Sequence, residues 1–208
     1  MTHTLHRRGP RESLENDFVL FAIPAQGFNE KGSIPKLTKF FDIVTKYDPV
    51  NLGDCGTGNK YGVGEEGIRE NITQSSVVHA VFTEKEVFQQ AMQEVKEADL
   101  GISIIGTGIL DAVDKLSREV GIERHTIEHS LGIWGDRDKL PEDEILEITT
   151  MCGHGMISTN LVKLVIGKVK DGKMTPEEAA RQVSPNCHCG VFNPKRAAEI
   201  IERIVEGN

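Results

Sequence analysis

The chain has 208 residues, of which 38% are hydrophobic and 27% are charged, as is usual for a soluble globular protein. Its formal net charge of −8 argues against a nucleic-acid-binding surface, because such a surface needs basic side chains to replace phosphate counterions. No apolar run approaches the roughly 20 residues of a membrane span, and the first residues lack a secretory signal's apolar core. We therefore expect a cytoplasmic protein that binds neither nucleic acid nor membrane.

The N-terminal arm, residues 1–16, is locally basic. His6, Arg7 and Arg8 lie in a stretch that contains no acidic residue before Glu12. Such a segment could fold over a site and bind the carboxylate or phosphate of a substrate. The competing interpretation is a frayed, solvated terminus.

Residues 17–135 alternate between two apolar patterns. Continuous apolar runs of strand length, each followed by a segment with helical apolar spacing, lie at residues 17–24, 77–82 and 100–105. Repeated strand-and-helix units favour a small parallel or mixed sheet of about four strands covered by helices. We therefore predict an α/β domain here.

Residues 125–134 are the predicted fourth strand, because apolar and polar side chains alternate along them. His125 and His129 fall on the apolar face of that strand. Each histidine could be satisfied by a backbone carbonyl in the core, or could line the site. We keep His129 as a candidate for moving a proton.

Residues 51–64 contain five glycines in fourteen positions. Glycine lets backbone amides approach a ligand closely, and successive amides can hold an anion. The segment is no P-loop, because no Gly-Lys-Ser/Thr follows. It could be an ordered active-site loop, a mobile surface loop or a linker. For the first case the substrate-binding candidates are Asn51, Asp54, Gly56 and Gly58.

Residues 136–208 predict a helical subdomain that carries three of the four cysteines. Cys152 lies in one glycine-containing turn, whereas Cys187 and Cys189 lie in another. Both turns precede predicted helix N-termini, where unpaired amides and the helix dipole favour a thiolate. Lasting disulfides are rare in a reducing compartment, so metal binding or thiol reactivity is the better explanation.

Several kinds of site could use these cysteines. A zinc site would take Cys152, Cys187, Cys189 and a histidine, but the paired Cys-x-x-Cys knuckles are missing. Zinc needs sulfurs about 3.8 Å apart, whereas residues two apart in an extended turn have α-carbons about 6.6 Å apart. An iron–sulfur cluster suits that separation better, and its fourth position is open to Cys55, a histidine or substrate. The remaining alternatives are a reactive Cys152 with His154 as base, and incidental core thiols.

The leading hypothesis is an iron–sulfur enzyme that acts on a small anionic substrate by lyase-type or redox chemistry. The arm and the glycine-rich loop would bind the substrate, and His154 or His129 would move a proton. The alternative is a non-catalytic zinc or iron–sulfur module, redox or structural, that docks on a partner protein. A homo-oligomer is the default expectation for such an enzyme.

The role of Cys55 separates these hypotheses. Ordering its glycine-rich loop has a large cost in conformational entropy, because glycine loses the most conformational freedom when it becomes ordered. We therefore expect Cys55 not to be equivalent to the other three and one metal position to stay open, by analogy with catalytic zinc. An equivalent Cys55 would favour the electron-transfer or structural alternative.

Overall fold

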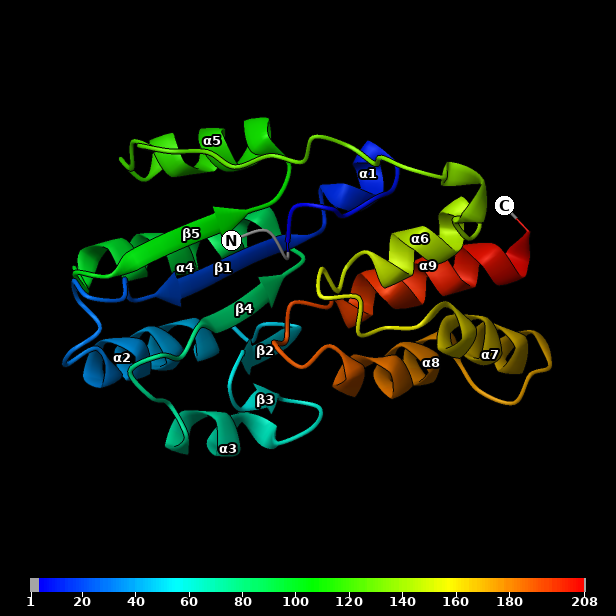
Figure 1. Cartoon of the computed structure of the whole chain (residues 1–208), viewed down its shortest axis with the longest axis horizontal. Helices are drawn as coiled ribbons and strands as arrows, with labels where there is room; N and C mark the ends of the chain where they lie inside the picture. The colour runs from blue at the N-terminus through cyan, green and yellow to red at the C-terminus, as the bar shows by residue number, and fades with distance from the viewer. Residues whose placement is uncertain (1–3, 208) are drawn as a thin grey trace.

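The computed structural model describes residues 4–207, so residues 1–3 of the predicted arm and residue 208 of the predicted helical subdomain lie outside it. A sheet with its helices forms one part of the molecule, and a group of helices forms the other (Figure 1). The described strands are β1 (Phe18–Ile23), β2 (Asn51–Asp54), β3 (Gly58–Asn59), β4 (Val78–Phe82) and β5 (Ser103–Thr107). Within residues 4–207, no helix is long and apolar enough to cross a lipid bilayer.

The α/β class is confirmed, but the sheet has five described strands in the order β3-β2-β4-β1-β5. The expectation of a parallel or mixed sheet is corrected, because every described pair of neighbouring strands is antiparallel. β1 and β2, joined through α2 (Ile34–Thr45), do run in the same direction, but β4 lies between them. Likewise, β4 and β5, joined through α4 (Lys85–Glu97), are separated by β1. These are split β-α-β units.

The sheet is buried on both faces. Phe18, Leu20 and Ala22 of β1 pack with α2, α4 and α5 (Leu110–Glu119). The alternate residues Val19 and Phe21 pack with the helical part. This double burial explains why β1 reads as a continuous apolar run rather than as an alternating one.

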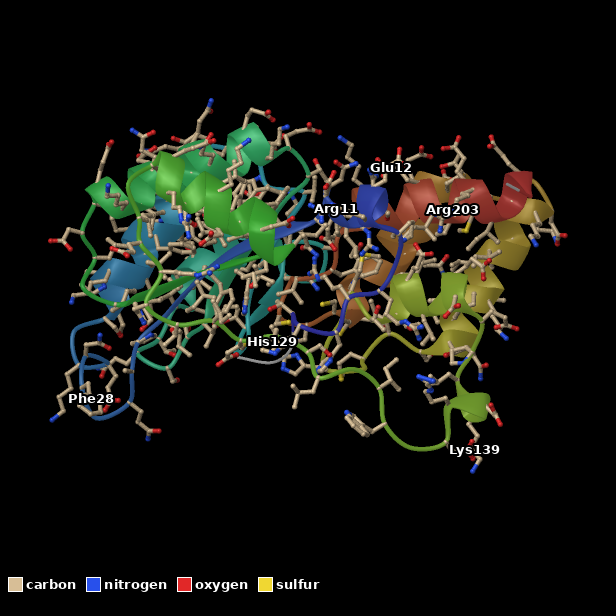
Figure 2. All side chains as sticks on the ribbon, turned by 90° about the horizontal axis from the view of Figure 1, so that it is seen from above. Arg11, Glu12, Phe28, His129, Lys139 and Arg203 are labelled. Atoms are coloured by element: carbon tan, nitrogen blue, oxygen red, sulfur yellow. The ribbon has the colours of Figure 1, made fainter. Side chains whose placement is uncertain are left out.

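The helical part follows residues 122–136, which contain no helix or strand. Its helices are α6 (Asp143–Thr149), α7 (Thr159–Lys170), α8 (Pro176–Val183) and α9 (Pro194–Glu206). The remaining described helices are α1 (Arg11–Leu14), α3 (Gly64–Glu70) and the 3-10 turns Arg137–Lys139 and Ser184–Asn186. Figure 2 shows Arg203 on α9 and Arg11 on α1.

Two predicted segments differ from the structure. Residues 125–134 form no strand: they run along the surface without regular structure, and Trp134 is 84% exposed. Gly132 and Gly135 have positive φ angles of 91° and 93°, which turn the chain out of the extended conformation. Conversely, the glycine-rich segment of residues 51–64, expected to be a loop or a linker, contains the strands β2 and β3 and leads into α3.

α8 begins with a capping box, as the pattern Thr175-Pro176-Glu177-Glu178 indicates. Thr175 Oγ1 accepts a hydrogen bond from the Glu178 amide, and the Glu178 carboxylate accepts one from the Thr175 amide. Thr83 and Glu86 have the same spacing and predict a second capping box, but this prediction is wrong, because α4 begins after Glu84 and no side chain caps it.

We expect Thr175→Ala to lower the free energy of unfolding by about 1 kcal/mol, because it leaves helix amides without a partner. Urea unfolding would measure this change. Thr126→Ala is the control: Thr126 is exposed and caps no helix, so we expect a change within about 0.5 kcal/mol. Equal effects of the two substitutions would contradict the capping argument.

Candidate metal centre

The glycine-rich hairpin β2–β3 lies directly against the second cysteine turn. A Cβ atom added at Gly53 would lie 2.6 Å from the carbonyl oxygen of Cys189. A Cβ atom added at Gly190 would lie 2.6 Å from the amide nitrogen of Gly53, and Gly190 has a φ of +75°. Two backbones therefore meet here at a separation that only glycine permits.

Two buried asparagines attach the hairpin to that turn. Asn51 Nδ2 donates to the carbonyl of Phe192 at 2.8 Å. Asn59 Nδ2 donates to the carbonyls of Cys187, at 2.7 Å, and Ser184, at 3.1 Å. The sequence prediction missed Asn59, although its place in the glycine-rich loop was the available signal. These bonds order the loop and fix the position of the turn.

The four cysteines of the chain come together at this contact. Side-chain hydrogen bonds join them in the order Cys152, Cys187, Cys189 and Cys55, which we call the sulfur row. All four thiols are free, the first three are buried and Cys55 is half-buried. Cys55 comes from the β2–β3 hairpin, whereas the other three come from the helical part. The structure thus adds the candidate fourth ligand to the three predicted from the two turns.

Backbone amides also point at the sulfur row. The amides of His154 and Met156 donate to Cys152, the amide of Phe192 donates to Cys187, and the amide of Val191 donates to Cys189. Each of these bonds favours the thiolate form of its cysteine. In iron–sulfur proteins, amide hydrogen bonds to the ligand sulfurs help to set the reduction potential of the cluster.

Neighbouring thiols and burial raise the pKa of three cysteines of the sulfur row. The hydrogen bond that Cys152 donates to Cys187, and then burial, raise the pKa of Cys152 far above its usual range. At Cys187 the bond from Cys152 lowers the pKa, but the bond donated to Cys189 and burial together raise it to about 12. At Cys189 the bond from Cys187 lowers the pKa, but the bond donated to Cys55 and burial raise it to about 12. The backbone amides lower the pKa of each of these three thiols, but the neighbouring thiol and burial outweigh them.

Cys55 is the exception in the sulfur row. The hydrogen bond from Cys189 lowers the pKa of Cys55, and this effect outweighs burial. Metal binding would have to remove the protons of the other three thiols, because thiolate is the ligating form.

The two candidate proton-moving histidines lie in different places. His154 is exposed, and its Nδ1 lies 3.6 Å from the Sγ atom of Cys189. His129 is exposed on the irregular segment of residues 125–134 (Figure 2). The structure thus brings His154, but not His129, into hydrogen-bonding contact with the sulfur row.

Several substrate-binding candidates use their polar groups inside the protein. Arg7 pairs with the buried Asp17 and donates to the carbonyl of Val191. The carboxylate of Asp54 accepts from the amide of Val77 at 2.9 Å and from the hydroxyls of Thr57 and Ser76. Asn51 holds the cysteine turn, as described above. These contacts give each of the three candidates a structural role.

Of the other candidates, His6, Arg8 and Gly56 are at least partly exposed, whereas Gly58 is buried in β3. His6 Nδ1 lies 3.2 Å from Ser130 Oγ, and Arg8 pairs with Asp143 at 3.0 Å. Gly56 is an exposed turn residue. At Gly58, an added Cβ atom would lie 3.7 Å from the ring of His188. The hydroxyl of Thr4 lies 3.3 Å from that of Thr107 on β5, so the arm contacts the sheet as well as the helical part.

The sulfur row does not surround a position for a single metal ion. Within the described part of the chain, no group of three or more His, Cys, Asp or Glu side chains is arranged to hold a metal ion. One tetrahedral zinc ion would need all four sulfurs in mutual contact, about 3.8 Å apart. The thiols form a row instead, and a cluster distributes four thiolate ligands over several iron atoms.

Comparison of the chain with protein-family models, with curated proteins and with solved structures gives no match. The functional argument therefore depends on the residues of the sulfur row and their surroundings.

Proposed function

We propose that Cys55, Cys152, Cys187 and Cys189 hold an iron–sulfur cluster where the sheet meets the helical part. The observation that carries this proposal is the meeting of all four cysteines in one row that also receives backbone amide hydrogen bonds. Four cysteine thiolates are the usual ligand set of both two-iron and four-iron clusters. When bound, such a cluster supplies one-electron transfer.

We further propose that the protein is a redox module that docks on a partner protein, the alternative named from the sequence. The contact of Cys55 with Cys189 supports a complete set of four ligands, because the asparagine bonds already order the glycine-rich loop. Two surface hollows, of about 430 and 420 Å³, have no cysteine in their lining. The polar groups of Arg7, Asn51 and Asp54 are engaged within the chain, which argues against their use for a substrate.

The second candidate function is the iron–sulfur enzyme with an open metal position and a small anionic substrate. The observation that favours it is the exposed imidazole of His154 beside Cys189, where it could exchange a proton with a bound substrate. In that case Cys55 would leave one iron position for the substrate.

Purification without oxygen tests the metal centre itself. Brown protein with iron and acid-labile sulfide supports the proposal, whereas colourless protein with stoichiometric zinc identifies the zinc alternative. A folded protein that binds neither iron nor zinc, even after reconstitution with iron and sulfide, overturns the proposed iron–sulfur centre.

The Cys55→Ser variant separates the two candidate functions. We expect its iron content to fall as far as that of Cys152→Ser, because each loses one thiolate of a complete set. His188→Ala is the control, since this exposed residue lies between two ligands and should leave the iron in place. Iron content and the visible spectrum are measured, and circular dichroism checks folding.

Full iron occupancy in Cys55→Ser would contradict the redox-module proposal. It would support the enzyme if an added small carboxylate also changed the cluster spectrum.

A further inference from the structure

His154 lies in the turn between α6 and α7, and its backbone and side chain both face the sulfur row. The amide of His154 donates to Cys152, and Nδ1 of the same residue lies 3.6 Å from Cys189 Sγ. The sequence separates His154 from Cys189 by 35 positions. One residue of the first cysteine turn therefore contacts both cysteine turns.

The direction of the side-chain hydrogen bond follows from the chemistry of a metal ligand. A thiolate bound to iron carries no proton, so its sulfur can only accept a hydrogen bond. The Nδ1 atom of His154 must then carry the hydrogen and donate it. Hydrogen bonds to an ionised acceptor are about twice as strong as bonds between neutral groups.

Such a bond stabilises one oxidation state more than the other. Reduction adds one negative charge to a cluster, and part of that charge resides on the ligand sulfurs. A donor directed at a sulfur therefore stabilises the reduced state more than the oxidised state. Hydrogen bonds to the sulfurs are among the determinants of a cluster's reduction potential.

We propose that His154 is a positioning residue that raises the reduction potential of the cluster by donating a hydrogen bond from Nδ1 to Cys189 Sγ. This inference rests on the proposed iron–sulfur centre. The hydrogen bond gives His154 a role in both candidate functions. The reduction potential of the cluster governs electron transfer in the redox module and in the enzyme alike.

The test compares the reduction potentials of iron-loaded variants at one pH. His154→Leu removes the donor, and we expect it to keep the iron and to shift the equilibrium between the two states about tenfold toward the oxidised form. For a one-electron couple this shift is a decrease of about 59 mV. His154→Asn places an amide nitrogen near the position of Nδ1, and we expect it to restore part of the potential.

His188→Leu is the matched control for the loss of an exposed imidazole beside the ligands. We expect its potential to equal that of the unaltered protein. An unchanged potential in His154→Leu overturns the inference, as does an equal decrease in His188→Leu. Loss of iron from His154→Leu overturns it too, because His154 would then be a ligand. Absence of iron from the unaltered protein instead removes the proposed function, and this inference with it.

Discussion

Replacing Gly190 with alanine should lower the free energy of unfolding by about 3 kcal/mol or more. The added methyl group would collide with the backbone of Gly53 and would also force a residue with a Cβ atom to adopt a φ of +75°. Neither backbone can move away easily, because the asparagine bonds attach the hairpin to the turn on both sides of the contact. We also expect the variant to lose iron, since Cys189 precedes the altered residue. Urea unfolding and iron analysis measure the two effects.

Gly172→Ala is the matched control for this substitution. Gly172 has a similar φ of +69°, but nothing lies within 4 Å of an added Cβ atom. Its replacement should cost about 1 kcal/mol from backbone strain alone and should leave the iron content unchanged. If the two variants were equally stable, the close contact between hairpin and turn would be refuted.

The second large effect is expected from Asp17→Asn. The Asp17 carboxylate is fully buried and faces two guanidinium groups, those of Arg7 and Arg196, of which Arg196 lies at 3.0 Å. Burial lowers the pKa of Arg196, which opposes its charge, and Asp17 supports the charged form. Removing the negative charge leaves two buried cations without their counterion. We expect a loss of about 3–5 kcal/mol in the free energy of unfolding.

Asp42→Asn provides the control for that experiment. Asp42 pairs with Arg69 at 2.7 Å on the surface, where water screens the interaction. Its replacement removes the same formal charge, and we expect it to cost no more than about 1 kcal/mol. Urea unfolding measures the loss of stability in both variants. Equal losses would show that the change in net charge, rather than the buried contact, is responsible.

The sequence predicts elements well where the signal is local. β1 and β4 are continuous apolar runs. The N-caps Thr175 and Asn193 mark the starts of α8 and α9. β2 was missed because Asn51–Asp54 contains a single apolar residue, although all four residues are buried. The strand direction was missed because it depends on which strand lies between two others. Residues 125–134 carry the alternation of a strand but have no strand partner.

The candidate site shows the same limit. The two cysteine turns were found from sequence, because glycines and helix starts surround them. The position of Cys55 beside Cys189 was not predicted from the sequence, because it depends on hydrogen bonds between residues far apart in the chain. Asn51 is 141 positions from Phe192, and Asn59 is 128 positions from Cys187. The arm was left open between two alternatives, and the contacts of Arg7 with Asp17 and Val191 show that it packs against both parts.

The wide separation of the four cysteines along the chain has a consequence for biosynthesis. A ribosome adds about 5–20 residues per second, so the sheet would emerge seconds before the turn that carries Cys187 and Cys189. Until α9 emerges, Val19, Phe21 and Val81 of the sheet lack the helical part that covers them. A growing chain that exposes such a face is a substrate for chaperones. A cluster held by all four cysteines could therefore be inserted only after the turn that carries Cys187 and Cys189 has emerged.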